Sequence, residues 1–231
     1  MHRACRFGHV QVTQALLRQP GVGVNAGNVG MATPLYFACQ EGKKEVVSLL
    51  LADKRIDVNK PNKYEATPFY IACAVGYKEV VSLLLADTRI DVNKPENNHC
   101  TPLWFASQNG HLPVVQLILA SGRDIDTKTK SIAGTARWNN QIAAENNKTA
   151  AERARFQGTR EKQNGPSMAD LIDSYEQNPQ QIRTQLRKQL GLKGRSFFVF
   201  FFLSNPVFSD FFADLPSAPT LQGKSTQSMF C

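Results

Sequence analysis

The chain has 231 residues, of which 42% are hydrophobic, and a formal net charge of +8. The hydrophobic fraction is ordinary for a globular protein and excludes a chain that is disordered throughout. Five cysteines with no CxxC pair and no Cys/His cluster at metal-ligand spacing exclude a fully paired disulfide framework and a zinc-finger type of site.

A ten-residue phrase recurs along the first half of the chain. It reads TPLYFACQEG from Thr33, TPFYIACAVG from Thr67 and TPLWFASQNG from Thr101, so both steps are 34 residues long. The same register extends back to Cys5 and Gly8. A period of this length with a Thr-Pro-Leu opening is typical of stacked helical repeats, and the phrase resembles the ankyrin repeat. The resemblance implies an all-α repeat solenoid of helix-turn-helix units joined by hairpin-like fingers.

Each phrase carries the start and stop signals of a first helix. The threonine that opens it can cap the helix, the proline after it suits the first helical position, and the closing glycine suits a left-handed turn. A second helix is expected next, with an apolar stripe that neighbouring repeats must cover. In repeats two and three this stripe comprises Val46, Val47, Leu49, Leu50 and Leu51, and Val80, Val81, Leu83, Leu84 and Leu85.

Polar stretches separate the helix pairs. Residues 57–62 and 91–96 predict fingers whose bases are held by apolar side chains, namely Ile56, Val58, Ile90 and Val92. The fourth repeat ends at residues 121–126 and is expected to be one residue shorter than its predecessors. The resembled phrase usually has His after Thr-Pro-Leu, whereas Tyr36, Tyr70 and Trp104 stand here, so we expect altered hydrogen bonding between repeats.

The C-terminal half predicts a weaker repeat and a cap. Residues 149–158 resemble a degenerate first helix, and Ser167 with Asp170 resembles a capping box that opens the second. A last amphipathic helix is expected with Ile182, Leu186 and Leu190 inward and Arg183, Arg187 and Lys188 outward. The expected divisions are a truncated repeat (1–32), repeats two to four (33–66, 67–100, 101–132), a long finger with repeat five (133–178), a capping helix (179–193) and a Phe-rich tail (194–231).

The tail begins with seven apolar residues, Phe197 to Leu203. This run is far shorter than the roughly 20 residues that span a bilayer. Two interpretations stay open: translation of an intron or of a wrong reading frame, and a genuine hydrophobic docking segment. Sequencing the transcript across this run distinguishes them.

Charge and cysteine placement bear on partners and compartment. Residues 121–195 hold 14 Lys/Arg against 8 Asp/Glu, which favours an acidic partner. Nucleic acid is not expected because no recognised reader motif accompanies the charge. Cys5, Cys39 and Cys73 share one small-residue core position, and no signal peptide is recognisable, which predicts a reducing compartment, the cytoplasm or nucleus. We expect a monomer.

No constellation of catalytic residues is recognisable. His9 and His111 each follow a turn glycine, and Gly223-Lys224-Ser225 lacks the first glycine of a phosphate-binding loop, since Ala218 stands there. We therefore expect no enzyme activity, no cofactor and no metal site.

The remaining function is binding. We expect a protein-interaction scaffold that holds its partner through the fingers and the concave face of the first helices. The alternative is a regulatory fragment of a larger enzyme, such as a kinase or a ubiquitin-ligase adaptor, which a signature elsewhere in the full-length locus would reveal. Positions that vary between repeats, together with aromatic residues that could anchor an interface, predict the residues that bind the partner. For Phe37 and Phe105, core packing is the alternative role. The predicted set comprises Phe37, Gln40, Glu41, Lys43, Tyr64, Ala74, Val75, Tyr77, Asn98, His99, Phe105, Gln108 and Trp138.

Overall fold

The computed structural model describes residues 1–129, 149–157 and 167–192, all within one compact unit, Met1–Arg195. These residues contain eleven helices and no strand. Four helix pairs come first, and three further helices follow. The pairs are α1 (His2–Phe7) with α2 (Val10–Arg18), α3 (Pro34–Gln40) with α4 (Lys44–Ala52), α5 (Pro68–Val75) with α6 (Lys78–Ala86), and α7 (Pro102–Gln108) with α8 (Leu112–Ala120). The last three helices are α9 (Ala150–Gln157), α10 (Met168–Gln177) and α11 (Pro179–Gln189).

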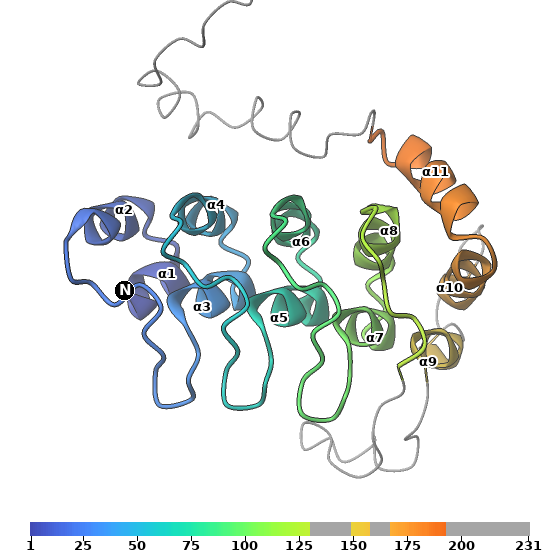
Figure 1. The fold of residues 1–231 in the computed structure, drawn as a ribbon, viewed down its shortest axis with the longest axis horizontal. Coiled ribbons are helices and arrows are strands. Elements are labelled where there is room, and N and C mark those ends of the chain that lie inside the picture. Colours follow the sequence, from blue (N-terminus) through green and yellow to red (C-terminus); the bar gives the residue numbers. More distant parts are fainter. Residues whose placement is uncertain (130–148, 158–166, 193–231) are drawn as a thin grey trace, which may run out of the picture. The chain divides into compact units, whose positions relative to one another are not determined.

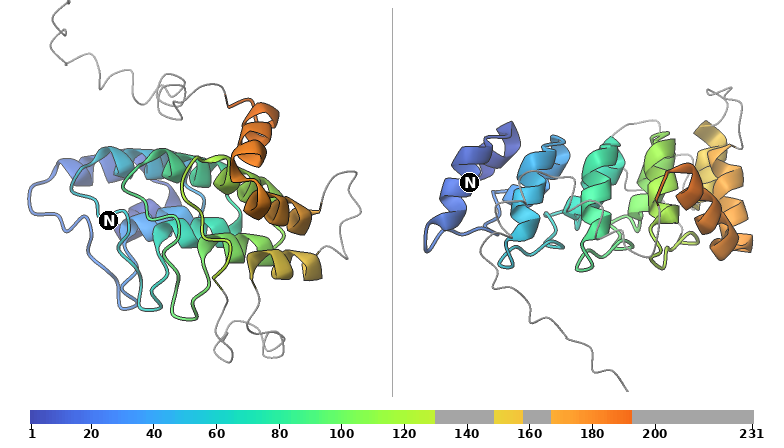
Figure 2. Two further views of the ribbon diagram at one scale, coloured as in Figure 1. Left: turned by 45° about the vertical axis from the view of Figure 1, so that its right-hand side comes forward. Right: turned by 90° about the horizontal axis from the view of Figure 1, so that it is seen from above.

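The helix pairs stack in two rows. α1, α3, α5, α7 and α9 pack side by side in one row, and α2, α4, α6 and α8 form the second row beside it (Figures 1 and 2). The fingers between successive pairs all extend to the same side (Figure 1). The predicted all-α repeat solenoid is confirmed. No helix within the described residues is long and apolar enough to cross a membrane.

The predicted start and stop signals of the first helix are present in the structure at each copy of the repeated phrase. The hydroxyl oxygens of Thr33, Thr67 and Thr101 accept a hydrogen bond from the backbone N–H three residues later, at 3.1, 3.1 and 3.2 Å. Gly42 and Gly76 follow with φ of 65° and 90°, in the left-handed region that suits glycine. The chain therefore reverses at the same point in each repeat.

The core lies between the two rows and between neighbouring repeats. Val46, Val47 and Leu50 of α4 are fully buried, while Leu49 and Leu51 are partly exposed. α6 buries the corresponding stripe, and Ile56, Val58, Ile90 and Val92 are buried at the finger bases as predicted. Burial of one helix by the next repeat makes the stability of each repeat depend on its neighbours.

Asparagine side chains at a 34-residue interval join each repeat to the next. Asn59 donates from its amide to the carbonyl oxygen of Arg89 at 2.6 Å and accepts from the backbone N–H of Asp91 at 2.8 Å. Asn25 makes the same two bonds to Arg55 and Asp57 at 2.7 and 2.9 Å. Asn93 repeats them once more, at 2.8 and 2.9 Å, and we call these three residues the asparagine bridges. Each bridge fixes the position of one repeat on the next.

The bridges correct the predicted length of the fourth repeat. Asn59 bonds to residues 89 and 91, whereas Asn93 bonds to residues 124 and 126. The partners of Asn93 thus lie one residue further along the chain, so the fourth repeat is one residue longer, and the expectation of a shorter repeat is wrong. Gly122, with φ of 85°, lies in the turn that holds the extra residue.

The C-terminal helices close the stack. Ser167 and Asp170 form the predicted capping box of α10. α10 packs mainly on α9, whereas α11 packs on α8 more extensively than α10 does. Leu186 is buried as predicted, and Ile182 and Leu190 are partly buried. The prediction that Arg183 points outward is wrong. It donates to the carbonyl oxygen of Arg123 at 3.0 Å and to the hydroxyl of Tyr175 at 2.8 Å, because α11 crosses the loop after α8.

A recurring arrangement of side-chain acceptors holds the finger tips. Asn28 and Asn62 each accept the backbone N–H groups two and four residues ahead. Glu96 occupies the corresponding place and accepts from Asn98 N at 2.9 Å and Cys100 N at 3.4 Å. Only 8% of Glu96 is exposed, and this burial raises the pKa of its carboxyl group above the usual 4.5, against smaller opposing effects of its hydrogen bonds.

The core register predicts the effect of truncating Leu84, which is fully buried in α6. Leu84→Ala should lower the free energy of unfolding by about 2–5 kcal/mol, because it removes buried methyl groups and leaves a cavity. Urea denaturation followed by circular dichroism measures the change. A midpoint equal to that of the wild type would contradict the register.

The buried carboxyl group of Glu96 predicts that the stability of a Glu96→Gln variant relative to the wild type depends on pH. A carboxyl group whose pKa is raised on folding binds protons more tightly when folded, so its contribution to stability falls as pH rises from 4.5 through the folded pKa. Glu96→Gln keeps the acceptor oxygen without the charge, so its stability advantage over the wild type should grow across that window and then level off. Urea midpoints at a series of pH values measure this advantage.

Glu65→Gln is the matched control, because Glu65 is exposed on the neighbouring finger and lies 3.8 Å from Lys94. It should show no such gain. A Glu96→Gln advantage that is constant with pH would contradict the account of Glu96.

Candidate protein-binding surface

The candidate surface consists of the exposed side of the first helices together with the fingers, and we call it the inner face. The 34-residue period places residues at equivalent positions on it. One column holds Arg3, Phe37, Ile71 and Phe105, a second holds Arg6, Gln40, Ala74 and Gln108, and a third holds Phe7, Glu41, Val75 and Asn109. The predicted contacts on the first helices all fall in these columns.

Aromatic side chains form the floor of the inner face. Tyr36 and Tyr70 are buried with Ala32 and Ala66, and Phe37, Ile71, Ala74 and Phe105 pack over them, partly exposed. Burial raises the pKa of Tyr36 to about 12, against a smaller opposing effect of its hydrogen bond with Asn62 on the next finger. The tyrosines that replace the expected histidine therefore belong to the core between fingers.

Phe37 and Phe105 combine both roles that the sequence left open. The Phe105 ring lies 5.0 Å from the Tyr70 ring and 5.1 Å from the Trp104 ring. The guanidinium carbon of Arg6 lies 5.8 Å from the centre of the Phe37 ring, and His2 meets the same ring edge-on at 5.9 Å. Each phenylalanine packs on the core with one side and keeps an exposed part on the inner face.

The polar members of the predicted set differ in their accessibility. Gln40 and Glu41 are partly exposed, and Glu41 accepts from Arg6 Nε at 3.0 Å. Gln108 is buried, and its Oε1 has no hydrogen-bond partner among the described residues. Trp138 lies outside the described residues. Gln108 is therefore the member of the set least available to a partner.

The residues after the turn glycines bridge neighbouring repeats. A Cβ atom placed on Gly42 would lie 2.8–2.9 Å from atoms of the Tyr77 ring, and one on Gly8 would lie 3.1 Å from Lys43 Cδ. His111 covers Gly76 in the same way, and its Nε2 donates to the Ala74 carbonyl oxygen at 3.0 Å. Tyr77 thus packs across a repeat boundary as well as being partly exposed.

The finger tips present further side chains. Tyr64 is 46% exposed, and the Lys63 ammonium lies 4.9 Å from the centre of its ring. Asn98 and His99 occupy the next tip, where His99 is exposed. Backbone bonds tie the tips together, since Lys63 N donates to Gly30 O at 2.9 Å and Asn97 N donates to Tyr64 O at 3.1 Å.

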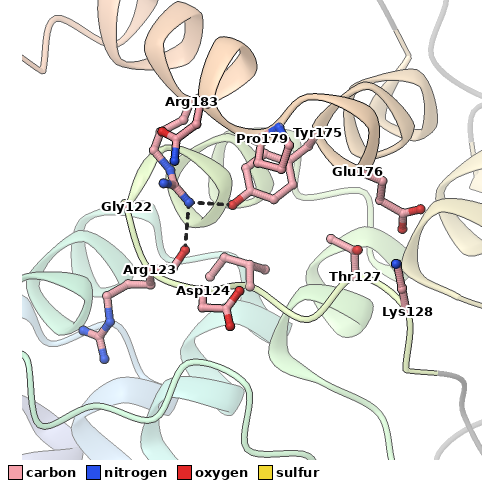
Figure 3. Close-up of a pocket in the computed structure, with 11 residues that line it drawn as sticks. Gly122, Arg123, Asp124, Thr127, Lys128, Tyr175, Glu176, Pro179 and Arg183 are labelled. Atoms are coloured by element: carbon pink, nitrogen blue, oxygen red, sulfur yellow. Dashed lines mark hydrogen bonds between the residues drawn. The ribbon is translucent and has the colours of Figure 1, made fainter.

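A separate hollow of 440 Å³ lies where α10 and α11 meet the loop after α8. Figure 3 shows Arg183 bonded to Tyr175 and to the Arg123 carbonyl at its edge. Asp124, Glu176 and Lys128 line it too, so charges of both signs face the same space. The described residues contain no group of three His, Cys, Asp or Glu side chains that could hold a metal ion.

Comparison with known families decides which repeat this is. The model for ankyrin repeats, in three copies, matches residues 1–62 and 56–129. The chain belongs to the ankyrin-repeat family. No curated protein is significantly similar to it. Ankyrin repeats are protein-interaction modules, so the family supports protein partners for this chain.

The ankyrin inner face includes residues that the sequence analysis did not select. Phe7, Val29 and Met31 are exposed apolar side chains on α1 and the first finger. Phe7 stands 34 residues before Glu41 and 68 before Val75, so the period could have identified it. Val29 and Met31 carry no such signal, because their equivalents Lys63 and Glu65 are charged.

The contact of Tyr77 with Gly42 yields a prediction with an internal control. Gly42→Ala and Gly110→Ala both place a side chain at positive φ, 65° and 76°, which costs about 1–2 kcal/mol. Only Gly42 has a ring within reach, since nothing lies within 4 Å of a Cβ on Gly110. Gly42→Ala should therefore be the more destabilising by about 1 kcal/mol.

Combining Gly42→Ala with Tyr77→Ala should abolish that excess, as a double-mutant cycle by urea denaturation would show. Equal costs of the two glycine substitutions would mean that the Tyr77 ring does not pack on Gly42. Tyr77→Ala alone should lower the free energy of unfolding measurably, because the ring packs on Gly42 of the preceding repeat.

Proposed function

We propose that this ankyrin chain is a non-enzymatic interaction module that binds a protein partner through its inner face. Within the described residues, seven large apolar side chains are exposed, and all but Val12 lie on α1, on α5 and the residue that follows its turn, or on the fingers. This observation carries the proposal, because exposed apolar side chains that concentrate on one set of elements indicate an interaction site.

The arrangement of the inner face supports binding rather than catalysis. Its side chains are held by repeat-to-repeat contacts, and the aromatic floor offers half-exposed rings of the kind that anchor interfaces. No nucleophile with a base and an orienting group was recognised in the sequence. Within the described residues, Cys5, Cys39 and Cys73 are buried and form no disulfide, which supports a reducing compartment such as the cytoplasm or nucleus.

A matched set of variants tests the proposal. With a partner captured by the full chain and identified by mass spectrometry, Tyr64→Ala and Val75→Ala should each weaken binding, by about 2 kcal/mol where the residue is an anchor. Their effect on stability should stay below about 0.5 kcal/mol, because both residues are exposed and neither belongs to the buried core. Calorimetric titration and urea denaturation provide the two readouts.

Val12→Ala is the control, because Val12 on α2 is 51% exposed, compared with 38% for Val75 on α5. It should leave affinity unchanged. Loss of affinity in Val12→Ala with none in Tyr64→Ala and Val75→Ala would place the binding surface on the second helices and contradict the proposal.

A further inference from the structure

The basic residues of the described chain differ in whether they are already engaged. In the C-terminal part, Arg155 pairs with Asp173, Arg183 bonds to Tyr175 and the Arg123 carbonyl oxygen, and Arg123 itself donates to the carbonyl oxygens of residues 87, 88 and 90. These guanidinium groups hold the fold together, so they are poorly placed to attract a partner.

The N-terminal end of the inner face carries cations without such partners. Arg3 is exposed at the position equivalent to Phe37, and Lys43 lies on the turn glycine Gly8. Neither forms an ion pair with a carboxylate in the part of the chain that the structure describes. Arg6 pairs with Glu41, the one acidic residue in these inner-face columns, yet its side chain remains 54% exposed.

Exposed apolar side chains flank these cations. Phe7 and Val75 occupy the same column on either side of Glu41, with exposed fractions of 56% and 38%. Tyr77, in the column of Lys43, is 38% exposed. The inner face of the first three repeats thus alternates excess positive charge with apolar surface.

We propose that this part of the inner face binds an extended acidic protein segment with apolar anchor residues. The segment would place carboxylates near Arg3, Arg6 and Lys43 and an apolar side chain against Val75. Charge complementarity favours an acidic segment, since a basic segment would be repelled and a neutral one would leave the cations without opposite charges. The inference rests on the proposed function and specifies the chemistry of the partner.

The test uses the full chain and a random peptide library displayed on phage. Selected peptides should be enriched in Asp and Glu together with apolar residues, and their affinity should fall as salt concentration rises. Synthetic copies of the enriched peptides should bind Arg3→Glu about fivefold or more weakly than wild type. Val75→Ser should weaken binding about tenfold, and Lys188→Glu, the same charge change on an exposed residue of α11, should have no effect.

The outcomes separate this inference from the proposed function. If the selection enriched neutral or basic peptides, and these bound Val75→Ser more weakly than the wild type, the acidic segment would be contradicted. The inner face would still be the binding surface. Peptides that bind Val75→Ser and wild type equally would contradict the inner face itself. A selection that enriches no peptide would also contradict the proposal, because an extended segment would then not suffice for binding.

Discussion

The asparagine bridges are the constraint on which the rest of the structure depends. Each one uses both hydrogen-bonding ends of an amide, donating to a carbonyl oxygen and accepting from a backbone N–H in the next repeat. A buried apolar stripe alone would allow neighbouring repeats to slide, since the hydrophobic effect is non-directional. The paired hydrogen bonds of Asn25, Asn59 and Asn93 fix one register.

That register has a direct consequence for the inner face. Because each repeat is placed on the next by the same contacts, side chains 34 residues apart fall into columns, and the finger tips are joined by backbone bonds such as Asn97 N to Tyr64 O. A partner would therefore meet a continuous, preorganised surface, which lowers the entropic cost of association. The apolar residues exposed on it, Tyr64 and Val75 among them, need no rearrangement to become accessible.

The parts of the fold that depend on local chemistry could be predicted from the sequence. Thr67 with Pro68 and Gly76 specify their helix through backbone rules that act within one repeat. Asn25, Asn59 and Asn93 recur at the same period, but a periodic polar residue in a finger has the same sequence pattern whether or not it bonds to the next repeat, so the asparagine bridges could not be predicted. The role of Arg183 could not be predicted, since it depends on how α11 crosses a loop 60 residues earlier in the chain.

Native-state hydrogen exchange of the backbone amides tests the central claim most directly. The amides of Asp57 and Asp91, which donate to Asn25 and Asn59, should open together with the core helices, and Asn59→Ala should lower protection throughout repeats two and three. If Asn59→Ala lowered the protection of the Asp91 amide alone and left the helices on both sides protected as in the wild type, the bridges would stabilise only the fingers. The bridges would then not fix the register of the repeats.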